Sequence, residues 1–178
     1  SYAVAIYSAA SFEITNLYLD GWMYGLSLGE LIVADGAALT IKNSVLEMHP
    51  YEGCGWGVLL ESIYGIITVE DSDIYIDAYG YGGPTEYDSY FIIPIFTIAG
   101  TVNIVNSKED AILRGFAFAI HAYLYFGVSV AYIDTDAYIA TYDDSFIYAI
   151  FYVYPGVIDV HGSEFEMPVY GNAFTFFF

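Results

Sequence analysis

The stretch GIITVEDSDIYIDAYG, residues 65–80, contains the pattern that decides the fold. Apolar residues alternate with other residues up to Val69, and after the pair Asp71-Ser72 they alternate again with a shifted phase. Alternation with a period of two buries one face of a β-strand. Asp and Ser suit a corner between two such strands because their side chains bond nearby backbone groups. The stretch therefore predicts a strand, a corner and a second strand.

The same unit recurs along the chain. Its anchors are the pairs Asn43-Ser44, Asp71-Ser72, Asn106-Ser107, Asp134-Thr135 and Gly162-Ser163, with an imperfect first copy at Asn16-Leu17. The second residues of the pairs are 27 or 28 positions apart, except for one interval of 35. A fixed period with one insertion indicates a stacked repeat architecture, in which each unit pairs with the next. We predict an all-β fold, a single-stranded parallel β-solenoid of about six coils of ~28 residues.

Residues 1–178 are expected to form one β-helix domain, with residues 1–10 as an N-terminal cap. A Gly or Ala about seven residues before each anchor marks the turn into the unit, at Ala37, Gly65, Gly100 and Gly156. The longer interval predicts a loop insertion at residues 80–90, where Gly and Pro gather.

The charge balance excludes one class of partner and disfavours another. The formal net charge is −19, and only Lys42, Lys108 and Arg114 are basic. Nucleic acid is excluded because binding its phosphates needs a basic surface. Anionic membranes are disfavoured, and a polyanionic ligand would need a bridging cation. The uncharged residues 115–133 reach the length of a membrane span, but their place in the repeat favours a solenoid coil.

Exposed tyrosines are the candidate ligand-binding residues. Tyrosine rings stack on sugar faces or pack against a partner, because one part is apolar and the other polar. The candidates near the inserted loop or on outward positions after a corner are Tyr75, Tyr79, Tyr81, Tyr87 and Tyr138.

Outward positions after the later corners carry carboxylates. Adjacent coils lie roughly 4.8 Å apart, which brings Asp136 beside Glu164 and places Asp110 and Glu166 on the same face. Carboxylates this close share a hard cation such as Ca²⁺ or raise one another's pKa, as paired catalytic acids require. The remaining alternative is a solvated face that keeps the fold soluble. Asp110, Asp136, Glu164 and Glu166 are therefore the candidate Ca²⁺ ligands.

No catalytic residue is predicted. His49, His121 and His161 fall at different offsets from their anchors, so the repeat places them on separate walls and not in one site. The sequence contains no Gly-rich phosphate loop, no paired-Cys metal motif and no nucleophile elbow.

Units such as ALTIKNSVLEMHP (residues 38–50) and residues 65–80 resemble the coils of right-handed parallel β-helix proteins. The likeness is strongest to the extracellular and cell-surface modules of bacteria and archaea that bind polysaccharide. It implies a right-handed β-helix outside the cell or on its surface, associated with acidic glycans through bound Ca²⁺.

Catalytic β-helix proteins are similar in outline. The polygalacturonase-like hydrolases carry Asn-Thr-Asp, Asp-Asp, Gly-His-Gly and Arg-Ile-Lys elements in that order. This chain offers Asp134-Thr135-Asp136, Asp143-Asp144 and His161-Gly162 at shorter spacings, and it lacks the Arg-Ile-Lys element.

Three functions follow. The first is a noncatalytic module that binds carbohydrate, alone or with Ca²⁺. The second is a structural or self-associating solenoid, either a fibre or adhesin segment or an artificial sequence without an evolved ligand. Residues 116–154 favour it, because both the inward and the outward positions of the expected strands are apolar or aromatic, including Tyr123, Tyr125 and Tyr152. One of the two faces would then be an exposed apolar surface, which usually marks a partner site. The third is a glycan-cleaving enzyme.

Overall fold

The computed structural model describes residues 2–24, 28–51, 56–80, 90–115, 117–143, 145–170 and 174–175. In these segments the regular structure consists of β-strands, with no helix. The all-β prediction is therefore confirmed. Most of the inserted loop predicted at residues 80–90, including Tyr81 and Tyr87, lies outside the described residues.

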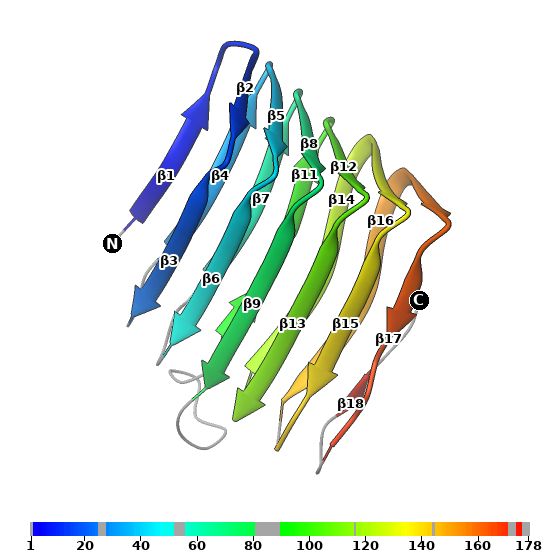
Figure 1. The fold of residues 1–178 in the computed structure, drawn as a ribbon. Helices are drawn as coiled ribbons and strands as arrows, with labels where there is room; N and C mark the ends of the chain where they lie inside the picture. The colour runs from blue at the N-terminus through cyan, green and yellow to red at the C-terminus, as the bar shows by residue number, and fades with distance from the viewer. Residues whose placement is uncertain are drawn as a thin grey trace.

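Each coil has three strand segments, and these build two sheets (Figure 1). The first wall contains β1 (Tyr2–Ser8), β4 (Leu28–Asp35), β7 (Trp56–Ile63), β10 (Tyr90–Ile92) and β11 (Ile95–Ile98). The second wall contains β2 (Phe12–Thr15), β5 (Ala38–Lys42), β8 (Ile66–Glu70) and β12 (Thr101–Val105). The long strands β14 (Ala117–Ile133) and β16 (Phe146–His161) run through both walls, and β18 (Phe174–Thr175) pairs with β16. These strands form one 12-stranded sheet.

The third wall is a six-stranded sheet whose strands each follow one anchor. Its members are β3 (Tyr18–Tyr24), β6 (Val45–Tyr51), β9 (Asp73–Gly80), β13 (Lys108–Gly115), β15 (Asp136–Thr141) and β17 (Glu164–Glu166). All pairings between these strands are parallel. Four of the strands have a neighbour on both sides, and β3 and β17 are the edges. The N-terminal segment expected as a cap contributes β1, which pairs in parallel with β4.

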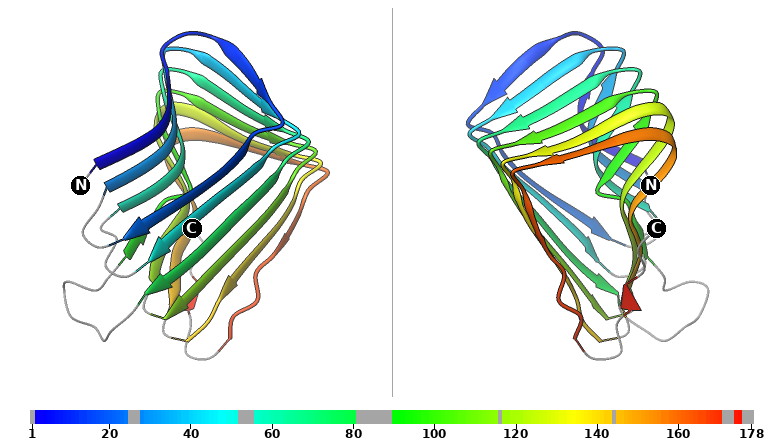
Figure 2. Two further views of the ribbon diagram at one scale, coloured as in Figure 1. Left: turned by 60° about the vertical axis from the view of Figure 1, so that its left-hand side comes forward. Right: turned by 90° about the vertical axis from the view of Figure 1, so that its right-hand side faces the viewer.

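The coil is right-handed. In Figure 1 the strands of the six-stranded sheet run downward in front while the first wall rises behind them, and the chain advances from left to right. The end-on view in Figure 2 shows the same sense of winding around an enclosed interior. A right-handed connection between parallel strands is the rule, because strand twist favours it. The parallel β-solenoid is thus confirmed.

The anchor residues form a ladder of hydrogen bonds along the solenoid. Bonds of 2.9–3.3 Å run from Ser44 N to Ser72 Oγ, from Ser72 N to Ser107 Oγ, from Ser107 N to Thr135 Oγ1 and from Thr135 N to Ser163 Oγ. The hydroxyls also donate to the carbonyl two residues earlier, as Ser72 does to Glu70 at 2.7 Å. The preceding residue has a φ of 46–64° in all six copies, from Asn16 to Gly162. Asn, Asp and Gly are the residues that adopt this left-handed conformation most readily.

A second corner separates the first wall from the second. The left-handed residues there are Gly36, Tyr64, Ala99 and Phe126, with φ of 50–64°. Each of the first three directly precedes a predicted turn residue, Ala37, Gly65 or Gly100. A side chain at Gly65 would lie 2.7 Å from the carbonyl oxygen of Ala37, so this position needs glycine.

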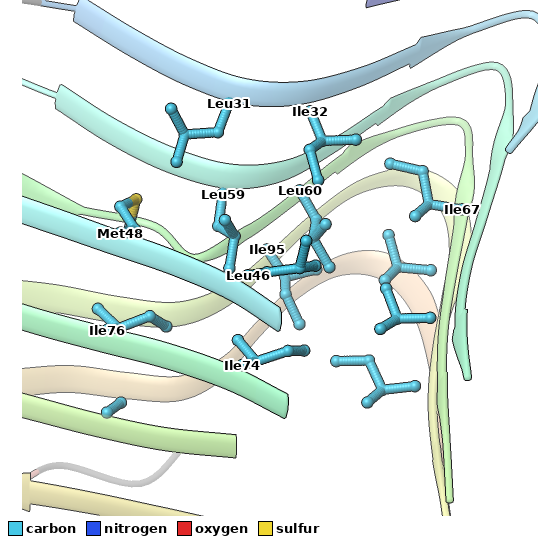
Figure 3. Packing of buried hydrophobic residues seen from close by; sticks show 14 of the residues in the cluster. Leu31, Ile32, Leu46, Met48, Leu59, Leu60, Ile67, Ile74, Ile76 and Ile95 are labelled. Carbon is cyan, nitrogen blue, oxygen red and sulfur yellow. The ribbon is translucent and has the colours of Figure 1, made fainter. Parts of the chain in front are cut away.

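Inward side chains stack in columns between the walls, as Figure 3 shows for ten labelled residues. Leu46 and Ile74 are in register on the third wall, and Leu39 and Ile67 on the second. All four are at most 1% exposed. The alternation read from the sequence therefore identifies the core.

A hydrogen-bonded polar pair also lies in this largely apolar interior. Glu109 lies in register between Ile74 and Ala137 and is 1% exposed. The hydroxyl of Tyr132, itself fully buried, donates to Glu109 Oε2 at 3.1 Å. Burial, together with the nearby Glu109 carboxylate, raises the pKa of Tyr132 well above its usual value. Tyr132 therefore serves as a hydrogen-bond donor in the core.

Candidate functional site

The outer face of the six-stranded sheet carries most of the residues singled out in the sequence. Side chains alternate between the two faces of a strand, and the parallel register aligns equal offsets from the anchor. One row accordingly reads Asp20, Glu47, Tyr75, Asp110, Tyr138 and Glu166 from β3 to β17. This outer face is turned toward the viewer in Figure 1.

The four predicted Ca²⁺ ligands lie together at the end of this face formed by β13, β15 and β17. They surround a hollow of about 270 Å³ lined by Lys108, Asp110, Asp136, Ala137, Tyr138, Glu164 and Glu166. Asp136 is in register with Glu164, as expected. We call this region the acidic hollow.

A basic side chain shares the acidic hollow. Lys108 Nζ lies 2.5 Å from Asp110 Oδ2, and the hydrogen bond from this ammonium to the carboxylate raises the pKa of Lys108. Part of the negative charge is thus already compensated. Such a pair leaves Asp136, Glu164 and Glu166 as the hollow's carboxylates outside this ion pair.

A different trio has the tightest ligand geometry. Among the described residues, the one set of three His, Cys, Asp or Glu side chains with all ligand atoms within 4.8 Å of one another is Asp20, Glu47 and His49. The different offsets of the three histidines in the repeat did not indicate this trio, because they relate His49 to the other histidines and not to carboxylates. Asp20 lies on the neighbouring strand β3, one coil earlier.

Aromatic rings form a row near the far end of the same strands. Tyr24 and Tyr51 have ring centroids 5.7 Å apart, and Tyr51 and Tyr79 are stacked at 5.4 Å. Trp22 extends the row, with its ring stacked on that of Tyr24 at a centroid distance of 6.0 Å. Trp22 and Tyr24 are 54% and 57% exposed. We call these four residues the aromatic row; of them, the sequence singled out Tyr79.

The other described candidate tyrosines, Tyr75 and Tyr138, lie on the same outer face, and Tyr138 also lines the acidic hollow. Tyr75 and Tyr138 line a shallow hollow of about 480 Å³ that also contains Glu47, His49 and Asp77. Hydrogen bonds with Tyr170 and Tyr142 raise the pKa of Tyr138 to about 12. The described tyrosine candidates therefore share one face of the solenoid, and their role in binding stays a prediction.

The elements that resemble a hydrolase motif are separated. Asp136, which matches the Asp of the Asn-Thr-Asp element, is the first residue of β15, and Asp143 occupies a left-handed position beyond the other end of that strand. A strand of six residues is roughly 20 Å long. Paired glycosidase carboxylates lie about 5–10 Å apart, so these two aspartates do not form such a pair.

The residues behind the self-association prediction are only partly described. The side chains of Tyr123 and Tyr152 lie outside those that the structure describes, whereas Phe126 and Val153 are 56% and 37% exposed. Within the described chain, no helix has the length and apolar character of a membrane span.

Comparison of the chain with protein-family models, with curated proteins and with solved structures gives no match.

Proposed function

We propose that this β-solenoid is a noncatalytic module that binds carbohydrate on the outer face of its six-stranded sheet, outside the cell or on its surface. The observation that supports this best is the aromatic row on a face rich in carboxylates. Aromatic rings pack against the C–H faces of sugars, and carboxylates accept hydrogen bonds from their hydroxyls. The resemblance to extracellular β-helix proteins supports the location.

Charge narrows the class of glycan. All three basic side chains of the chain are paired with carboxylates: Lys42 with Glu13 and Glu70, Lys108 with Asp110, and Arg114 with Asp77. A face with this balance repels a polyanion. The ligand is therefore a neutral polysaccharide, or an acidic one bridged by Ca²⁺ in the acidic hollow.

Removal of two rings from the aromatic row is expected to weaken glycan binding at least tenfold. The experiment compares the native chain with Tyr51→Ala/Tyr79→Ala in affinity electrophoresis and calorimetry against neutral and uronic-acid polysaccharides. Each ring is expected to contribute on the order of 1 kcal/mol of binding free energy. The matched control is Thr40→Ala/Thr68→Ala, which changes neighbouring coils on the second wall.

The same titrations, carried out in millimolar Ca²⁺ and in chelator, test whether Ca²⁺ bridges the acidic polysaccharide to the acidic hollow. Tighter binding of the acidic polysaccharide with Ca²⁺, lost in Asp136→Asn/Glu164→Gln, is the expected result. Equal binding by the native chain and by the tyrosine variant, or no binding to any polysaccharide, would exclude the proposed function.

A self-associating solenoid is the second candidate, and the last coil favours it. Val160 continues the inward column of Ile104 and Tyr132 but is 44% exposed. A second copy stacked on β16 and β17 would cover this residue and would pair the strand edge. Light scattering at micromolar concentration is expected to show particles larger than one chain, and Val160→Lys should reduce them. A native chain that is strictly monomeric would contradict this candidate.

A further inference from the structure

Asp20, Glu47 and His49 converge on one point of the outer face, near the aromatic row and away from the acidic hollow. His49 Nε2 lies 3.5 Å from Asp20 Oδ1 and 3.4 Å from Glu47 Oε2. All three side chains come from two adjacent parallel strands, β3 and β6, so the backbone holds them in register. Their side chains are 17–36% exposed, and the site is therefore open to solvent on one side.

The two distances are compatible with a shared metal ion as well as with an ion pair. Charge-assisted N–H to carboxylate bonds measure about 2.7–2.9 Å, clearly shorter than the two contacts of His49. With metal–ligand bonds of about 2.1 Å, neighbouring atoms of a tetrahedral Zn²⁺ site are about 3.4 Å apart. The separations between the imidazole nitrogen and the two carboxylate oxygens match this tetrahedron edge.

The imidazole is held in place by an aromatic neighbour. The Trp22 ring stacks on the His49 ring at a centroid distance of 4.3 Å and an interplanar angle of 17°. The Tyr18 hydroxyl lies 3.3 Å from Glu47 Oε2 and supports that carboxylate. Groups that orient the ligands in this way are typical of the shell around a metal site.

No lysine or arginine side chain pairs with the two carboxylates. Lys42, Lys108 and Arg114 are the whole Lys and Arg content of the chain, and each pairs with acids other than Asp20 and Glu47. A divalent cation would remove the repulsion between the adjacent carboxylates and stabilise the fold.

We infer that Asp20, Glu47 and His49 bind a Zn²⁺ ion, with the fourth position open to water or to an oxygen atom of a ligand. A nitrogen donor with two carboxylates suits Zn²⁺, whereas Ca²⁺ takes six to eight oxygen atoms. The site is therefore distinct from the Ca²⁺ proposed for the acidic hollow, and it does not depend on carbohydrate binding.

Calorimetry of the full chain, freed of any affinity tag and of metal, tests the inference with Zn²⁺ alone. The expected result is one Zn²⁺ per chain with a micromolar or lower dissociation constant. In a Trp56→Phe background, Trp22 is the remaining tryptophan, and its fluorescence should change in step with the heat signal. Millimolar Ca²⁺ should not displace the ion.

Two ligand variants and one matched control locate the ion. His49→Ala and Glu47→Gln should each weaken Zn²⁺ binding by about 100-fold or more, since even the loss of an outer-shell partner typically costs 10- to 100-fold. His161→Ala removes an exposed histidine elsewhere and should leave the affinity unchanged. Circular dichroism checks that each variant is folded. If His49→Ala does not fold, Glu47→Gln alone tests the site.

The inference is overturned if the native chain binds no stoichiometric Zn²⁺ at micromolar concentration. It is equally overturned if folded ligand variants keep the native affinity, or if Trp22 fluorescence is unchanged when Zn²⁺ binds. Loss of glycan binding in the tyrosine variant has no bearing on these readouts, so the two proposals fail separately.

Discussion

Replacement of Ile74 by aspartate is expected to abolish cooperative folding. Ile74 is 1% exposed and lies in register between Leu46 and Glu109 in the interior of the third wall. The substitution removes about 1.5–3 kcal/mol of apolar burial and places a carboxylate in a site without water. A second carboxylate, that of Glu109, would lie one strand spacing away, roughly 4.8 Å. The combined cost rivals the total stability of a typical domain, 5–15 kcal/mol.

Circular dichroism with urea denaturation measures this effect. Ile74→Val should retain a cooperative transition with a loss of about 1 kcal/mol, because only one methylene is removed. Tyr75→Thr changes the next residue, which points outward, and should also fold. If Ile74→Asp unfolds at the same urea concentration as the native chain, the side chain of Ile74 does not point into the interior.

The third wall was predictable because one physical requirement repeats there in successive coils. A tight corner needs a left-handed residue followed by a backbone amide that finds an acceptor. Asp71 supplies the conformation and Ser72 supplies the hydroxyl, and the same chemistry recurs in neighbouring coils. The period and the strand phase follow directly from these pairs.

The corner between the first and second walls could not be located from the sequence as closely as the anchor corner. Its left-handed positions are occupied by Gly36, Tyr64, Ala99 and Phe126, which share no side-chain chemistry. The coil imposes the conformation, and Tyr64 and Phe126 adopt a φ that bulky residues rarely take. The sequence showed only the small residue that follows, where the backbone of the preceding coil approaches closely.

The candidate sites also divide into those that the repeat predicts and those that it does not. Outward offsets from the anchor were enough to group Asp110, Asp136, Glu164 and Glu166 around one hollow. They did not reveal the trio with His49, because it joins two adjacent offsets on neighbouring strands. Comparing carboxylates with histidines across one coil spacing would have found it. The buried Glu109 was hidden for another reason: Lys108 and Asp110 on either side make the segment look uniformly exposed.

The stability of the chain is expected to fall as the pH rises from 5 to 8. Glu61 on β7 is 5% exposed. Burial, a hydrogen bond with Glu30 and the charges of Glu30 and Asp35 together raise the pKa of Glu61 to about 8. Because the folded state holds this proton more tightly than the unfolded state does, the stabilisation is complete below the unfolded pKa and is lost as the pH rises through 8. The expected loss is on the order of 3 kcal/mol.

Glu61→Gln isolates this contribution from the general repulsion of a chain with a net charge of −19. The amide can donate to Glu30 as the protonated carboxyl does, and it does not titrate. Urea denaturation at pH 5, 6, 7 and 8 should therefore give a nearly flat stability for Glu61→Gln and a higher stability than the native chain at pH 8. The control Glu164→Gln removes an exposed carboxylate of the six-stranded sheet and should keep the native slope. If Glu61→Gln retains that slope, the proton held by Glu61 is not the source of the pH dependence.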